Sequence, residues 1–96
     1  MARREGDRLL LDGSVSVDTV ARLLPEAARA VRDGAAVVDL AAVTEVDSAA
    51  VALALALARE GRAAGREVVF ANVPEGMLQL AALYGVSSFL RLAGRG

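Results

Sequence analysis

The feature that most constrains this chain is an unbroken apolar run from Ala49 to Ala58, in which leucine alternates with alanine. Crossing a bilayer takes about 20 apolar residues, so this run predicts a helix buried in a small domain. The polar pair Asp47 and Ser48 stands directly before it. Either side chain can cap the helix, because an oxygen there accepts a hydrogen bond from a free N–H group of the first turn. We expect this helix to run from Ser48 to about Ala63.

Composition excludes several classes of function. The chain has no Cys and no His, which removes disulfides, thiol nucleophiles, imidazole acid–base chemistry and the usual zinc ligands. It also has no lysine, so we find no nucleophile–base pair and predict a protein that is not an enzyme and needs no metal or cofactor. The 11 basic and 12 acidic residues are scattered along the chain. No nucleic acid partner and no direct membrane insertion are expected from such a balance.

The length of the chain and its N-terminal segment indicate the number of domains and the location of the protein. A chain of 96 residues is long enough for one domain with one core, so we predict a single domain over residues 1–96. The charged segment Met1–Arg8 is followed by only three leucines, and it therefore lacks the apolar core of a signal peptide. We expect a cytoplasmic location.

The order of the remaining elements follows from periodicity and turn residues. A first strand, Arg8–Gly13, is predicted to end in an Asp-Gly turn, and Ser14–Val17 could extend this strand or pair with it. Pro25 interrupts the next apolar stripe, and we favour a helix that begins near Leu24 with the proline in its first turn over a longer, kinked helix. The central strand is Ala36–Leu40, followed by a connection over Ala41–Val46.

The second half of the chain continues the alternation. The pattern predicts a strand at Glu67–Val73 and a helix at Gly76–Tyr84, and the tail Val86–Leu92 fits either an edge strand or one more helical turn. Alternating strands and helices imply parallel strands joined by right-handed crossovers. The fold class is therefore α/β, with a four- or five-stranded mostly parallel sheet and three to four helices.

The stretch Val37–Val51 resembles the signature of the STAS domain family: an apolar strand ending in Asp-Leu, a short connection, then Asp-Ser and two small residues opening a helix. The order of elements on both sides also matches, so the resemblance covers nearly the whole chain. Within the family, Leu80–Val86 and Leu23-Leu24-Pro25 look most like the MlaB-like group, small STAS subunits of Mla phospholipid-transport ABC complexes.

This resemblance implies a protein that binds a partner rather than a substrate. In the MlaB-like group, the hydroxyl residue at the position of Ser48 lies in the contact with the ATPase subunit. In anti-sigma-factor antagonists, the serine at this position is phosphorylated by the anti-sigma kinase, and the phosphate abolishes binding. The chain departs from both patterns, with Ala50 where many antagonists have glycine, and Glu26 and Ala27 where the MlaB-like pattern has a large aromatic residue.

Simpler interpretations stand beside these. On residue type alone, Ser48 is a helix cap, and Asp47 is a cap and loop organiser rather than a catalytic acid. Asp39 could belong to a site at the edge of the sheet, although an aspartate there more often binds backbone N–H groups. The resemblance favours a docking surface instead, and its candidate residues are Asp47, Ser48, Ala49, Ala50, Pro25 and Ala27. The expected partner is an Mla-type ABC ATPase at the inner membrane, and the alternative is an anti-sigma kinase that modifies Ser48.

Overall fold

The computed structural model describes residues 1–93, which form a five-stranded sheet packed with three α-helices. The strands lie in the order β1-β2-β3-β4-β5; β1 is antiparallel to β2, and the other neighbouring pairs are parallel. The predicted fold class is therefore confirmed. The strands are β1 (Ala2–Glu5), β2 (Arg8–Val15), β3 (Val37–Val46), β4 (Val69–Ala71) and β5 (Arg91–Leu92). The helices are α1 (Val20–Arg32), α2 (Ser48–Ala63), α3 (Glu75–Leu83) and the short 3-10 helix η1 (Ser87–Phe89).

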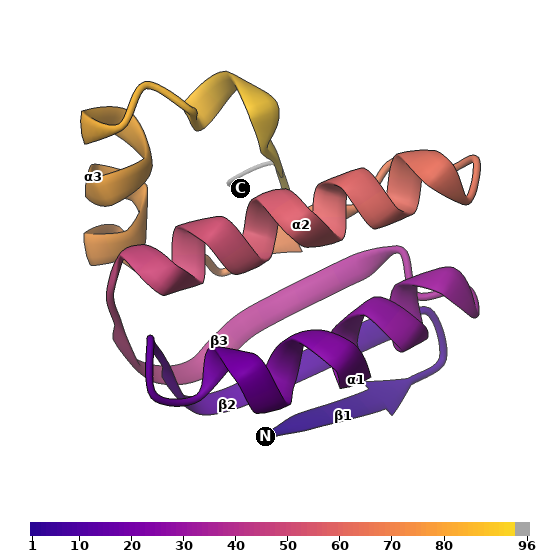
Figure 1. Cartoon of the computed structure of the whole chain (residues 1–96). Helices are drawn as coiled ribbons and strands as arrows, with labels where there is room; N and C mark the ends of the chain where they lie inside the picture. The colour runs from indigo at the N-terminus through magenta and orange to yellow at the C-terminus, as the bar shows by residue number, and fades with distance from the viewer. Residues whose placement is uncertain (94–96) are drawn as a thin grey trace.

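The helices α1 and α2 lie side by side against the sheet, and α3 lies near the beginning of α2 (Figure 1). Alternate residues of β2 and β3 face this layer, because successive side chains of a strand point to opposite faces. They form a single core with the apolar stripes of both helices. Its largest fully buried side chains include Phe70, Leu9, Leu11, Leu57 and Met77. None of the helices in the described part of the chain is both long and apolar enough to span a bilayer.

The helix α2 runs from Ser48 to Ala63, as predicted. The predicted strand Glu67–Val73 is shorter in the structure, since only Val69–Ala71 pairs with its neighbours. The tail contains both of the alternatives left open, because η1 is followed by the edge strand β5.

The first strand, β1, is formed by charged residues that gave no strand signal. It pairs antiparallel with β2 through a tight turn in which Gly6 has a φ of +62°. Two-residue hairpin loops need this conformation, and glycine adopts it without strain. The predicted Asp-Gly turn at Asp12-Gly13 was wrong, because β2 continues to Val15 with shifts of register on either side of this pair. The alternative, in which the residues after Gly13 extend the strand, is confirmed as far as Val15.

The predicted connection Ala41–Val46 was also wrong, since these residues extend β3. They pair with the second half of β2, from Asp12 to Val15. Most of their side chains are exposed, so this part of the strand lacks the continuous apolar pattern by which the buried half was recognised. The extension carries β3 directly to the start of α2.

The helix α1 begins at Val20, so the preferred late start near Leu24 was wrong, and Pro25 lies inside the helix. The early start is held by the preceding residues, because the backbone carbonyl of Thr19 accepts from the N–H groups of Arg22 and Leu23. Pro25 itself is exposed on the side of α1 away from the core. Its ring therefore interrupts the helix hydrogen bonds without filling a place in the core.

Replacing Pro25 with alanine is expected to raise the free energy of unfolding by about 2–2.6 kcal/mol. Proline costs about 3 kcal/mol relative to alanine in a helix interior, and the freer unfolded chain of the variant offsets roughly 0.4–1 kcal/mol of this gain. Urea denaturation of both proteins measures the difference. A loss of stability would show that the helix depends on the proline ring.

Candidate functional site

Asp47 organises the turn between β3 and α2. Its backbone is extended, its Oδ1 accepts a hydrogen bond of 2.8 Å from the N–H of Ala49, and its Oδ2 accepts one of 3.0 Å from the N–H of Val17. The first bond is the cap of α2, which confirms the interpretation of Asp47 as cap and loop organiser. The second bond ties this turn to the loop after β2, so one carboxylate holds two segments together.

Ser48 is the first residue of α2, and its side chain is exposed. Because Asp47 supplies the cap, the interpretation of Ser48 as the capping residue was wrong. Among the hydrogen bonds of residues 1–93, none involves the hydroxyl of Ser48. That hydroxyl is therefore available at the surface, at the positive end of a helix dipole.

The other candidate residues differ in how far their side chains are exposed to solvent. Ala49 is partly buried beside Ser48, and Pro25 is exposed on a different helix, α1. Ala50 and Ala27 are 1% and 0% exposed and belong to the core, so their side chains offer no surface to a partner. Including these two alanines as contact residues was wrong, because each is the small side chain of a buried helix position that faces the core. The structure brings together Asp47, Ser48 and Ala49.

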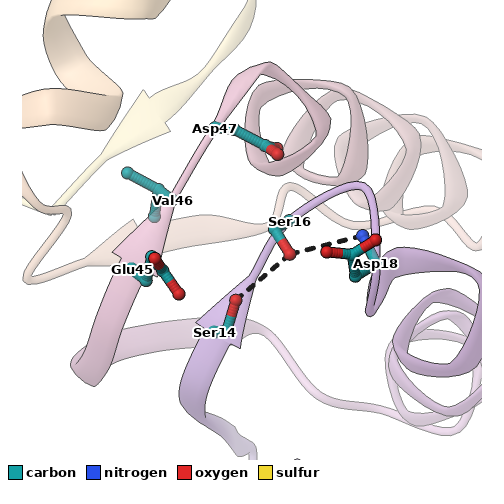
Figure 2. Close-up of a pocket in the computed structure, with 6 residues that line it drawn as sticks. All are labelled: Ser14, Ser16, Asp18, Glu45, Val46 and Asp47. Atoms are coloured by element: carbon teal, nitrogen blue, oxygen red, sulfur yellow. Dashed lines mark hydrogen bonds between the residues drawn. The ribbon is translucent and has the colours of Figure 1, made fainter.

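A cavity of about 220 Å³ opens to solvent beside this turn. One wall comes from the end of β3, and the other from the end of β2 and the loop that follows it (Figure 2). The lining is mostly polar and consists of Ser14, Ser16, Asp18, Glu45, Val46 and Asp47. Of these residues, only Asp47 was a candidate site residue from the sequence. The rule that carboxyl ends of neighbouring parallel strands meet at one edge would have pointed to them.

The loop after β2 is fixed by its own hydroxyl groups. The Oγ1 of Thr19 accepts from the N–H of Ser16 at 2.9 Å and donates to the carbonyl of Ser14 at 3.0 Å. The Oγ of Ser16 lies 3.1 Å from the Oγ of Ser14 and accepts from the N–H of Asp18. Such side-chain bonds to nearby backbone groups are typical of ordered turns. The wall of the cavity is therefore held in one conformation.

Asp39 is a structural residue rather than part of this site. It is 7% exposed in the middle of the sheet, and its Oδ1 accepts from the side-chain amide of Asn72 and from the N–H of Ala41, both at 2.9 Å. Its Oδ2 lies 3.0 Å from the Nε of Arg8. Burial by itself raises the pKa of Asp39, but the bonds from Asn72, Ala41 and Arg8 outweigh it and hold the pKa below its ordinary value. The interpretation of Asp39 as an acceptor for backbone N–H groups is confirmed.

A family model described as "Mlab, STAS domain" matches residues 2–92. The chain belongs to the STAS domain family. STAS domains are typically binding or regulatory proteins rather than catalysts. No curated protein matches the chain significantly.

Solved structures show the same fold. A putative anti-sigma factor antagonist from Thermotoga maritima aligns with a TM-score of 0.75 and 10% identity over 99% of this chain and 86% of that one. The anti-sigma factor antagonist SpoIIAA in its unphosphorylated form aligns with a TM-score of 0.65 and 16% identity over 100% of this chain and 88% of that one. The phosphorylated form of the Bacillus protein SpoIIAA aligns with a TM-score of 0.66 and 16% identity, covering 99% and 91%. At these identities the STAS domain shares the fold with these proteins, and function needs a separate argument.

Proposed function

We propose that this STAS domain is a non-catalytic subunit that binds and supports the ATPase of an Mla-type phospholipid-transport ABC complex, which maintains the lipid asymmetry of the outer membrane. The protein would be cytoplasmic and associated with the inner membrane through the transporter. The description of the matching family model supports this assignment, and the resemblance of Leu23-Leu24-Pro25 and Leu80–Val86 to the MlaB-like group agrees with it.

The observation that carries the proposal is the exposed hydroxyl of Ser48, which lies on a turn that the hydrogen bonds of Asp47 hold in place. Asp47 caps α2, so Ser48 is not needed as the cap. The bond from Val17 to Asp47 fixes the turn before any partner arrives. A surface held in its bound conformation loses little conformational entropy on binding, which favours affinity. The turn at Asp47, Ser48 and Ala49 is thus suited to protein docking.

Docking there would act on the ATPase through binding energy alone. A subunit that binds one conformation of the ATPase better than another shifts the population towards that conformation. In this scheme the domain stabilises the assembled ATPase, and ATP hydrolysis by the partner drives the movement of phospholipid. No group on the STAS domain needs to take part in the chemistry.

The alternative is an anti-sigma-factor antagonist that is switched by phosphorylation of Ser48. The exposed position of this hydroxyl at the first residue of α2 is the observation that favours it. N–H groups of a first helical turn accommodate a phosphate, while about two added negative charges would disrupt a close interface. The neighbouring carboxylate of Asp47 would repel the phosphate, which weighs against this alternative.

The test is affinity purification of the tagged protein from its native cells, with mass spectrometry of the proteins recovered and of the peptide that contains Ser48. We expect an ABC ATPase and its permease, with Ser48 unmodified. Recovery of a serine kinase together with phosphate on Ser48 would overturn the transporter assignment and support the switch.

A further inference from the structure

The end of the molecule that carries the docking turn bears three carboxylates that form no ion pair within residues 1–93. The carboxylates of Asp18, Glu45 and Asp47 line one cavity. The five ion pairs of residues 1–93 include none of the three. Like charges that share one concave surface raise each other's energy, and a cation placed among them relieves the repulsion.

The arginines in the last turns of α1 and α2 gather at the opposite end, whereas Arg22 lies in the first turn of α1, after the loop that follows β2. Because α1 and α2 both follow parallel strands, their C-terminal ends meet at one edge of the sheet, where the ion pair between Arg32 and Glu60 joins them at 3.3 Å. Arg29, Arg59 and Arg62 lie on the same two helix ends. The net charge of the chain is only −1, but the carboxylates of Asp18, Glu45 and Asp47 give the docking end a local negative charge.

An exposed apolar residue, Val17, lies in the sequence between Ser16 and Asp18, two residues that line the cavity. Val17 is 71% exposed, although it sits on a loop whose backbone N–H is fixed by Asp47. Protein interfaces combine an apolar contact with surrounding polar groups, and Val17 beside these carboxylates has that combination. The polar cavity, at about 220 Å³, is smaller than the sites that hold drug-sized ligands and suits a single side chain.

A metal ion does not explain the carboxylates, because within residues 1–93 no three acidic side chains are close enough together to hold one. A guanidinium or ammonium group carries several N–H donors, so it can bind acceptors that lie farther apart than the ligands of a metal ion. The hydroxyl groups of Ser14 and Ser16 add such acceptors to the wall of the cavity. Arginine, with five N–H donors in a planar fork, can bind several of them at once.

We infer that the docking surface of this domain extends across the cavity to Val17 and receives a partner segment in which a basic side chain enters the cavity next to an apolar residue. This inference rests on the proposed function, since it describes the partner of the same turn. The complementary surface on the ATPase is therefore positively charged. Electrostatic attraction of this kind accelerates association and orients the two proteins.

The test uses Asp18→Arg and Glu45→Arg, because neither side chain forms a hydrogen bond or ion pair within residues 1–93 and the fold does not depend on them. The matched control is Asp33→Arg, the same change of charge at the exposed C-cap of α1 at the other end of the molecule. Binding to the ATPase–permease complex purified from the same cells is measured at low and high salt. We expect each of the two variants to slow association about tenfold or more at low salt and to flatten its salt dependence, while the control behaves like the natural protein.

Two results would overturn the inference. Unchanged association of Asp18→Arg and Glu45→Arg, with binding still weakened by Ser48→Arg, would reject the basic partner and leave the proposed docking turn intact. A photo-crosslinking residue at position 17 gives an independent readout. The partner peptide that it captures should carry an arginine or lysine close to the crosslink, and a peptide without one would contradict the inference. Failure of the proposed function would look different, because the ATPase would then not bind the natural protein.

Discussion

Replacing Ser48 with arginine is expected to weaken binding to the ATPase at least a hundredfold while the domain stays folded. The side chain of Ser48 is exposed and outside the core, so a longer residue is accommodated in the free protein. A positive charge at a helix N-terminus costs roughly 0.3–1 kcal/mol, which a folded domain of this size tolerates. At the docking surface the same side chain would block close approach. A hundredfold loss corresponds to about 2.7 kcal/mol, the range of an interface hot spot.

The matched control for this variant is Ala63→Arg. Ala63 is exposed at the last residue of the same helix, where a positive charge is favourable, and it lies at the far end of α2 from the docking turn. Isothermal titration calorimetry with the purified ATPase measures both affinities, and circular dichroism verifies that both variants are folded. Equal affinity of Ser48→Arg and the natural protein would reject the docking turn. Ser48→Ala adds a second comparison, since it keeps the surface open but removes the only hydroxyl that the alternative could phosphorylate there.

Local signals predicted α2 well because they are strong and close together in the sequence. An acidic cap, a run of apolar residues and arginines near the end all point to the same helix. Because Asp47 directly precedes this helix in the sequence, it could also be interpreted as the cap. Its second bond, to the N–H of Val17, joins residues thirty positions apart and has no local signature. The turn at Asp47 was therefore predicted from the sequence, but its contact with the loop after β2 was not.

The errors arose where a long-range contact overrides local preference. The charged segment Ala2–Glu5 becomes a strand because Gly6 turns it back onto β2. Residues Ala41–Val46 remain in the sheet because β2 pairs with them, although most of their side chains are exposed. Pro25 stays inside α1 because the apolar stripe on both sides of it packs onto the sheet, so burial outweighs the intrinsic cost of proline. The burial of Ala27 and Ala50 could not be predicted either, because alanine is found both in the core and at the surface of helices.

Replacing Asp39 with alanine is expected to lower the free energy of unfolding at neutral pH by about 2 kcal/mol. The change would leave three donors without an acceptor in the middle of the sheet: the N–H of Ala41, the amide of Asn72 and the guanidinium of Arg8. Breaking a fully buried ion pair costs about 3–5 kcal/mol, whereas a lost hydrogen bond that leaves a buried group unsatisfied costs about 1–3 kcal/mol. The lower range applies because the side chain of Arg8 is 43% exposed and water can solvate it.

The same substitution should change how stability depends on pH. Because the folded protein holds the pKa of Asp39 below its ordinary value, ionised Asp39 stabilises the fold fully above the unfolded pKa of about 3.9, and this contribution is lost as the pH falls through the lower, folded pKa. The difference in unfolding free energy between the natural protein and Asp39→Ala should therefore be largest near neutral pH and shrink in acid. Urea denaturation over a series of pH values measures it, with Asp33→Ala as an exposed control. A difference that stayed constant down to the most acidic pH at which the domain folds would mean that the hydrogen bonds of Asp39 stabilise the sheet without its charge.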